Sequence, residues 1–390
     1  MTESEHQEPW FSADRKLAAV QSSFDFLTLT SPADTDKAWE QFERSRFERA
    51  PDLPGPAIDL DLSQLRRDVE SVNPQHVDDV DVQFILAGKQ IELERKLQML
   101  SVRGSVAFLS LGMLHYGAPD ADLLKMAKSI LRDLSPDEKP ADTVDADQIR
   151  ERAEAELRHY RSIDPRLEST VRQEEGQAAM QASHGDVLVP ADMTVSRQRM
   201  EALMQHEVGV HVVTYHNGAM QPLQVLRNGL AEYDELQEGI GVLAEFFADG
   251  LTPTRMRTLA ARVLAVDSLE NRASFVETFR LLKDDYGLDA REAFEVAAPV
   301  HACGGFPRDQ IYLRGLRWLL RYLAADCDLE PLFIGKLGRH TVPAVERLAK
   351  RGFLKPPVLR PRFLEGRAAE RKLERLRAGM TPLDLVTPAA

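Results

Sequence analysis

The stretch His206-Glu207-Val208-Gly209-Val210-His211 decides the fold, because it joins two histidines and a glutamate in one short segment. Zinc proteases are built from these parts: imidazoles and a carboxylate hold the metal, and a second carboxylate beside it handles protons. Histidines at the usual i and i+4 spacing lie about 40° apart on a helix. The spacing here is i and i+5, about 140° apart on the same arithmetic.

An ideal helix cannot direct both histidines toward one ion. Either the helix contains a one-residue π-bulge, a device that recurs at functional sites, or the two histidines are not both ligands. We place the expected distortion at Gly209, because a residue without Cβ tolerates unusual backbone angles.

A second stretch, Gln237-Glu238-Gly239-Ile240-Gly241, follows after enough chain for the helix to end and a second helix to return. Each glycine inside such a helix costs about 1 kcal/mol relative to alanine. Two of them beside Glu238 indicate the close approach of another part of the backbone. With both stretches present, a metal site is favoured over isolated surface or core histidines.

These motifs also carry a resemblance to a known family. The chain resembles the QEGLA-motif proteins (the flavohaemoglobin expression-modulating proteins of bacteria), a family that includes the microtubule-associated tyrosine carboxypeptidases of animals. The resemblance implies an α+β, predominantly α-helical fold with a zincin-like metallopeptidase core and a small β element before the HExxxH helix. Weaker similarity extends it over roughly residues 23 to 364, and the matching segments are HEVGVH (206–211), LQEGIGVLAEF (236–246), SFVETFRLLKDDYG (274–287), GGF (304–306) and RDQIYLRGL (308–316).

The expected mechanism uses one Zn²⁺ per chain, with His206, His211 and Glu238 as ligands and a fourth position left for water. Zinc lowers the pKa of such a water to about 7 and polarises the scissile carbonyl. Glu207 stands next to a ligand, where its carboxylate can take the water proton and return it to the leaving amine. Two other histidines, His184 and His216, compete for a place as ligand.

The oxyanion needs a further donor, which the segment of close resemblance near the C-terminus can supply. We favour Tyr312, although an ordinary tyrosine of an amphipathic helix fits equally well. The alternatives in the same region are His301, Arg308 and Arg314.

The chain departs from the family pattern just before the paired glycines. Relatives carry a pattern like R-V-Y-R-G-G-G, whereas both arginine positions are replaced here, by Pro299 and Ala302. If those arginines bind the substrate carboxylate in relatives, carboxypeptidase specificity is in doubt. Arg308 retains a planar cation that could bind a terminal carboxylate.

Composition excludes several other classes. The 390 residues carry a net charge of −13, which disfavours general binding to nucleic acid or to anionic membranes. No apolar run of membrane-spanning length and no secretory signal is recognisable, so we expect a cytoplasmic protein. The two cysteines, Cys303 and Cys327, form neither a disulfide framework nor a thiolate zinc site.

Hydrophobic periodicity divides the chain into four regions. These are a polar N-terminal tail (1–22), a helical region (23–147), a metallopeptidase-like catalytic region (148–364) and a charged C-terminal helix and tail (365–390). Besides the helices that carry the two motifs, helices are predicted at 37–49, 62–73, 79–102, 119–134, 148–160, 254–266, 270–286, 289–300, 308–325, 341–351 and 366–378.

The β-prone segment 186–196 is predicted to be a hairpin or bent strand ahead of the metal helix, with Ser196 as the helix N-cap. An extended segment at that place can pair with the backbone of a substrate, as edge strands do in metallopeptidases. A hairpin that only covers the core is the alternative.

Three hypotheses follow. The first is a zinc metallopeptidase, a carboxypeptidase that trims the C-terminus of a peptide or protein. The second is a metal-binding regulatory or interaction protein of the same fold without turnover, which the loss of the two arginines favours. The third, a helical scaffold without metal, leaves the combination of HExxxH and QEGIG unexplained.

Overall fold

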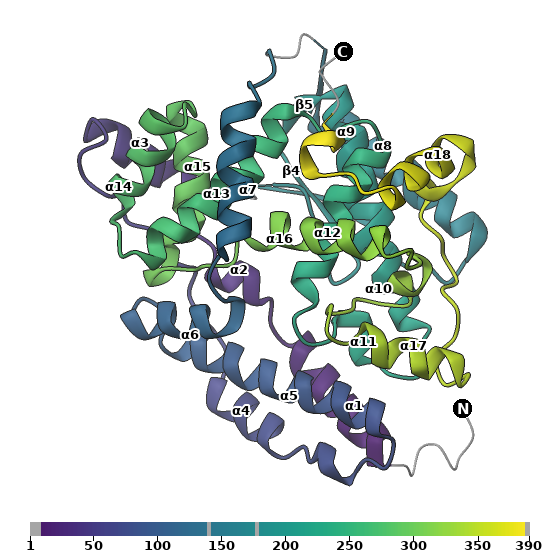
Figure 1. Cartoon of the computed structure of the whole chain (residues 1–390). Helices are drawn as coiled ribbons and strands as arrows, with labels where there is room; N and C mark the ends of the chain where they lie inside the picture. The colour runs from purple at the N-terminus through teal and green to yellow at the C-terminus, as the bar shows by residue number, and fades with distance from the viewer. Residues whose placement is uncertain (1–8, 139–141, 176–178, 387–390) are drawn as a thin grey trace.

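The computed structural model describes residues 9–138, 142–175 and 179–386. It is an α+β fold in which helices dominate and the strands form two small sheets, as the sequence predicted (Figure 1). None of the described helices is long and apolar enough to cross a membrane.

Among the described residues, eight helices precede the metal helix, and most of them begin at an aspartate that accepts a hydrogen bond from a free backbone amide. Residues 9–22 of the expected polar tail form the first of these helices, with Leu17 fully buried, so that part of the prediction was wrong. The eight are α1 (Pro9–Ser22), α2 (Phe26–Thr30), α3 (Thr35–Arg44), α4 (Leu62–Glu70), α5 (Val80–Ser101), α6 (Val106–Tyr116), α7 (Ala121–Asp133) and α8 (Ala146–Ile163), with a 3₁₀ turn, η2 (Pro74–His76), before α5.

The second half contains the metal helix, its return helix and the helices that cover them. The metal helix is one continuous rod made of α9 (Arg197–Leu203), the π-helical segment η3 (Met204–Val212) and α10 (Val213–Ala219). The others are α11 (Val225–Asn228), α12 (Tyr233–Phe247), α13 (Pro253–Glu270), α14 (Phe275–Arg280) with the π-helical segment η4 (Leu281–Asp285), α15 (Ala290–His301), α16 (Ile311–Ala324), α17 (Val342–Lys350) and α18 (Gly366–Arg377), with 3₁₀ turns η5 (Ala302–Gly304), η6 (Glu330–Phe333), η7 (Arg362–Leu364) and η8 (Pro382–Leu385).

The strands correct one of the two alternatives predicted for 186–196, the hairpin. The two β-prone runs of 186–196 are both strands, but they do not pair with each other. The first is the central strand of a three-stranded sheet of order β2-β4-β3, and the second pairs with β1 in a separate two-stranded sheet. The strands are β1 (Thr143–Asp145), β2 (Val171–Glu174), β3 (Gln181–Ser183), β4 (Asp186–Pro190) and β5 (Thr194–Ser196).

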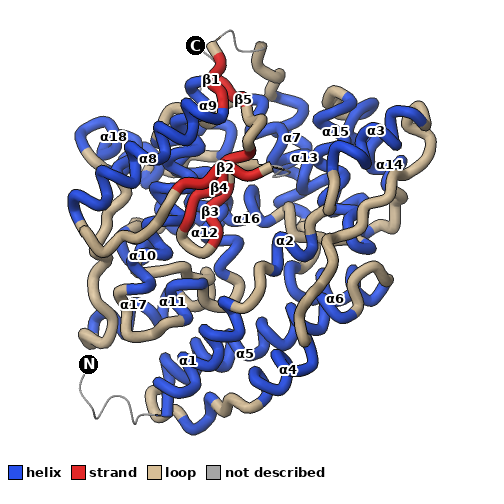
Figure 2. The backbone as a smooth tube through the Cα atoms, turned by 180° about the vertical axis from the view of Figure 1, so that it is seen from behind, coloured by secondary structure: helices blue, strands red, loops and turns tan. Residues whose placement is uncertain are grey.

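A hairpin therefore does precede the metal helix, but it joins β3 to β4 (Figure 2). Its two-residue turn has φ of 49° at His184 and 91° at Gly185, which is the left-handed pair that tight hairpins require. A Cβ on Gly185 would lie 2.4 Å from the Tyr215 ring, so the turn packs directly on the metal helix. Strand β3 is an edge strand of its sheet.

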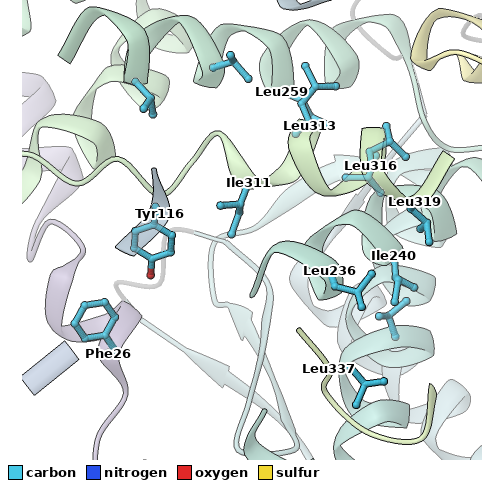
Figure 3. Close-up of a cluster of buried hydrophobic side chains, with 14 of the residues drawn as sticks. Phe26, Tyr116, Leu236, Ile240, Leu259, Ile311, Leu313, Leu316, Leu319 and Leu337 are labelled. Carbon is cyan, nitrogen blue, oxygen red and sulfur yellow. The ribbon is translucent and has the colours of Figure 1, made fainter. Parts of the chain in front are cut away.

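Two groups of buried hydrophobic residues hold the fold together. The larger runs from Ala13 to Leu385 and so joins N-terminal helices to α12, α13 and α16 (Figure 3). The smaller lies between α8, the sheets and the metal helix, and includes Leu359 from the C-terminal part. The large core thus crosses the boundary predicted between residues 147 and 148, and the metal helix contributes to both groups.

Candidate metal centre

The metal helix is distorted where the spacing of its histidines requires it. Residues Met204–Val212 are π-helical, with ordinary α-helix on both sides. Ser196 caps the rod, its hydroxyl accepting a hydrogen bond from the amide of Arg199 at 3.1 Å. The predicted distortion is confirmed. Gly209 lies within it without a left-handed φ, and a Cβ there would come 2.9 Å from Gln205 Oε1 and 3.3 Å from the Phe363 ring. Space, rather than backbone angle, is the physical reason for a glycine at this position.

The distortion brings the three proposed ligands together. The rings of His206 and His211 have centroids 5.0 Å apart. The Nε2 atoms of the two histidines lie 3.3 and 3.9 Å from Oε2 of Glu238, and the three ligand atoms fall within 4.8 Å of one another. A tetrahedral zinc ion with bonds of about 2.0–2.2 Å keeps its ligand atoms about 3.4 Å apart. The set therefore fits zinc after small side-chain movements.

His206 is oriented by a carboxylate that sequence reasoning missed. Its Nδ1 lies 2.9 Å from Oε1 of the fully buried Glu245. A carboxylate only accepts, so Nδ1 carries a hydrogen, and Nε2 is the ring nitrogen left to bind a metal once its own proton is lost. Glu245 is itself held by Arg199 and by Arg255, the latter at 3.1 Å. The available signal was its position two helical turns after Glu238, on the same face of α12.

His211 is oriented in the same way by a neutral group. Its Nδ1 lies 3.3 Å from Oε1 of Gln237, which also accepts a hydrogen bond from the Thr214 hydroxyl at 2.8 Å. An amide oxygen that already accepts from a hydroxyl favours the Nδ1–H tautomer of the ring. The Nε2 of His211 is thus directed, like that of His206, at Glu238.

The two glycines of QEGIG make room on opposite faces of α12. A Cβ on Gly239 would lie 2.5 Å from the carbonyl carbon of Gly315 in α16, which confirms the predicted close approach of a backbone. A Cβ on Gly241 would lie 2.4 Å from Cε1 of His206. The second glycine is therefore required by the imidazole itself.

The two histidines differ in protonation: without metal the His211 ring is neutral, whereas the His206 ring is protonated and must lose a proton to bind a cation. Burial lowers the pKa of His211 to about 3, so its ring is neutral, as a metal ligand must be. Burial also acts to lower the pKa of His206, but the carboxylates of Glu238 and Glu245 outweigh it and raise that pKa to about 9. The Glu238 pKa is lowered despite burial, because His206 and Arg308 stabilise its charge. The ionised carboxylate of Glu238 thus faces the point where a cation would sit, with its other oxygen paired to Arg308.

Glu207 lies beside this cluster and not in it. Its Oε2 accepts a hydrogen bond from the amide of Ala182 in β3 at 2.8 Å. Burial raises the pKa of the Glu207 carboxyl to about 7, against the lowering effect of His206 and of that amide. A carboxyl group with a pKa near 7 exchanges protons readily at neutral pH.

Two of the remaining predicted residues, Arg308 and Tyr312, lie near the three proposed ligands. Arg308 is buried, and its Nη2 lies 2.9 Å from Oε1 of Glu238. Tyr312 packs its ring against three guanidinium groups, with centroid distances of 4.7, 5.6 and 5.9 Å to Arg262, Arg308 and Arg255. Burial and the charge of Glu238 raise the pKa of Tyr312, so its hydroxyl keeps its proton. Both residues therefore adjoin the cluster.

The competing residues are engaged elsewhere. His216 Nε2 lies 2.8 Å from Asp164, and His301 Nε2 lies 2.8 Å from the Thr278 hydroxyl. His184 is in the hairpin turn, and Arg314 forms an ion pair with Glu235 at 2.6 Å. Within the described part of the chain, the one group of histidines, cysteines and carboxylates close enough to share an ion is His206, His211 and Glu238.

The chain is similar to one solved structure and to one protein family. A crystal structure of a candidate lipoprotein from Colwellia psychrerythraea is similar over 80% of this chain and 66% of that one, with 12% identity and a TM-score of 0.41. This chain thus spans just under two thirds of the length of that protein. No curated protein matches the sequence. The sequence pattern of one family, described as microtubule-associated tyrosine carboxypeptidase, matches residues 40–381, which include every residue of the cluster. The chain belongs to the microtubule-associated tyrosine carboxypeptidase family.

Proposed function

We propose that the chain is a zinc-dependent carboxypeptidase that removes residues from the C-terminus of a peptide or protein. The observation that carries the proposal is the convergence of His206, His211 and Glu238, with both Nε2 atoms facing one carboxylate oxygen. Glu245 and Gln237 orient the two histidine rings. The carboxyl group of Glu207 lies beside the three proposed ligands. A structural zinc site is closed by four protein ligands, whereas three ligands leave a position open.

When bound, zinc would polarise the scissile carbonyl and acidify a water molecule. The residues of the chain do the rest. Glu207 takes a proton in the attack and returns it to the leaving amine, for which a pKa of about 7 suits it. Tyr312 keeps its proton and serves as a hydrogen-bond donor to the developing oxyanion.

Arg308 was predicted from sequence to bind the terminal carboxylate of the substrate. Its contact with Oε1 of Glu238 favours another role, since it leaves Oε2 of the same carboxylate facing the two histidines. We propose that Arg308 fixes which oxygen of Glu238 is offered to the metal. Because its guanidinium group is paired with Glu238, Arg308 does not by itself bind the terminal carboxylate of the substrate.

A metal-binding protein without turnover is the second candidate, because Pro299 and Ala302 replace two arginines of the family pattern. Glu207 counts against it. A purely structural metal site gains nothing from a buried carboxyl group that ligates no metal and costs desolvation energy.

The decisive experiment measures zinc per chain and peptide hydrolysis in the same preparations. We expect one zinc in the wild type, little in Glu238→Ala, and one zinc with at least about a hundredfold loss of hydrolysis in Glu207→Gln. The matched control is Glu201→Gln on the same helix, which should behave as wild type. Full hydrolysis by zinc-loaded Glu207→Gln would refute the general-base role. Zinc without hydrolysis in the wild type would favour the second candidate.

A further inference from the structure

A cavity of about 130 Å³ lies beside the metal centre, at the end of β3. Gln181, Ala182 and Ser183 of that strand line it, and Ala182 is the residue whose amide binds Glu207. In the hairpin register Ala182 faces Val187 directly, while Ser183 and Asp186 close the two-residue turn. The N–H and C=O of Ala182 therefore point away from β4, toward the site. A peptide laid along this edge would enter the cavity just past Glu207.

Three lysines line the cavity, and two of them are neutralised. Lys89 lies 2.5 Å from Glu92, and Lys96 lies 3.1 Å from Glu92 and 3.7 Å from Asp234. Lys336 is the third. In the described parts of the chain, its ammonium group forms no ion pair and no hydrogen bond, although Lys336 is only 9% exposed.

An unpaired buried ammonium group is costly, so its position calls for a physical explanation. The backbone of Lys336 is fixed on both sides: its amide donates to the Leu226 carbonyl at 2.9 Å, and its carbonyl accepts from the Leu230 amide at 2.8 Å. Neighbouring Gly338 comes so close to that loop that a Cβ would lie 2.0 Å from the Ala231 oxygen. The chain thus holds Lys336 firmly in a place where, among the described residues, no carboxylate forms an ion pair with it.

Two aromatic rings form cation–π contacts with the ammonium group of Lys336, but they do not neutralise its charge. Its Nζ lies 5.7 Å from the ring centroid of Tyr215 and 5.8 Å from that of Tyr233. Both tyrosines line the cavity, and Tyr215 follows His211 by one helical turn. Two carboxylates also line it, but Asp234 pairs with Lys96, and Asp25 accepts hydrogen bonds from the amide of Thr28 and the hydroxyl of Ser183.

The cavity connects Lys336 to the strand that contacts Glu207. Lys336 and Ala182 line the same cavity, and the amide of Ala182 donates to Glu207 at 2.8 Å. Burial lowers the pKa of Lys336, and the carboxylates of Asp234, Glu207, Glu238 and Asp25 act against that lowering. A ligand that reaches Lys336 therefore lies along the strand that borders Glu207.

We propose that Lys336 binds a substrate carboxylate, that of the C-terminal residue, and that the cavity between Tyr215, Tyr233 and β3 holds that residue. The inference rests on the proposed function and adds the anchor for the chain end. The volume suits one side chain, since a cavity of about 150 Å³ takes a single benzene ring. A carboxylate of Asp or Glu has the same chemistry, so the test separates the two sources.

The test is affinity selection by zinc-loaded Glu207→Gln protein, which binds without cleaving. Three hexapeptide mixtures with random last residues serve as probes: free acids without Asp or Glu, the same peptides as C-terminal amides, and amides that end in Asp or Glu. We expect the free acids to be retained at least about tenfold better than the plain amides, as a charge-assisted hydrogen bond implies. Adding Lys336→Met should bring that ratio close to one without lowering the unfolding temperature, whereas the exposed Lys350→Met control should preserve the ratio.

The outcomes are distinct. An acid-to-amide ratio that Lys336→Met leaves unchanged overturns the assignment of Lys336. Retention of the Asp- and Glu-ended amides as strong as that of the free acids overturns recognition of the chain end. If wild-type protein hydrolyses nothing but Lys336 still governs the ratio, the proposed function fails and the carboxylate site stands.

Discussion

The described chain contains two π-helical segments, η3 and η4, which share a backbone geometry but differ in their surroundings and side chains. Both lie within segments that resemble the family, but η3 has α-helix on both sides, whereas η4 ends the helix that begins with α14. In η3 every residue except His211 is buried, and the extra residue per turn brings two imidazoles together. In η4 only Leu282 is buried, and the chain soon leaves the helix through Gly287 at φ 69°. A π segment thus indicates a site only where it is enclosed and carries ligand side chains.

The largest expected effect comes from changing the length of η3. One alanine inserted after Gly209 separates the histidines by six residues, about 240° on a regular helix, so both cannot reach one ion. We expect zinc to be absent on elemental analysis of the purified protein. The matched insertion after Asp284 in η4 should leave zinc at the wild-type level. Equal loss of zinc from both insertion variants would mean that a change in the length of any helix disturbs the site. It would contradict the difference in function that we infer between η3 and η4.

A smaller effect is expected from filling the space under His206. The methyl group of Gly241→Ala would lie 2.4 Å from Cε1 of the ring and must displace it. We expect zinc affinity, measured by competition with a coloured chelator, to fall by at least about a hundredfold. Gly209→Ala is the control within η3. Its nearest neighbour is the flexible end of Gln205, at 2.9 Å, so the affinity should change much less. Similar losses in the two variants would contradict this account of QEGIG.

The smallest of the three effects concerns the orientation of a ligand. Glu245→Gln keeps the shape of the side chain but removes the charge that holds Nδ1–H of His206 and neutralises Arg199 and Arg255. We expect zinc affinity to fall by about tenfold to a hundredfold and the unfolding temperature to decrease, since two buried arginines lose their partner. The exposed Glu277→Gln in α14 should change neither quantity. Unaltered affinity in Glu245→Gln would show that ring orientation is set by packing alone.

Much of the secondary structure followed from periodicity. The helices predicted at 79–102, 148–160 and 308–325 are present with ends shifted by a few residues. Helix α6 (Val106–Tyr116) was missed because it is apolar on nearly every face and shows no helical alternation. The pairing of 186–196 was wrong for a different reason, since strands choose partners by tertiary packing that a local pattern does not contain.

The sequence by itself determined the elements of the metal centre: the irregular histidine spacing demanded a distorted helix, and QEGIG demanded a close neighbour. Only the tertiary structure decided what surrounds them. Glu245 beneath His206, Arg308 against Glu238 and the unpaired Lys336 at the end of β3 come from segments far from HExxxH. Spacing along one helix is a local property of a few residues, whereas the partner of a buried charge depends on how distant elements pack together.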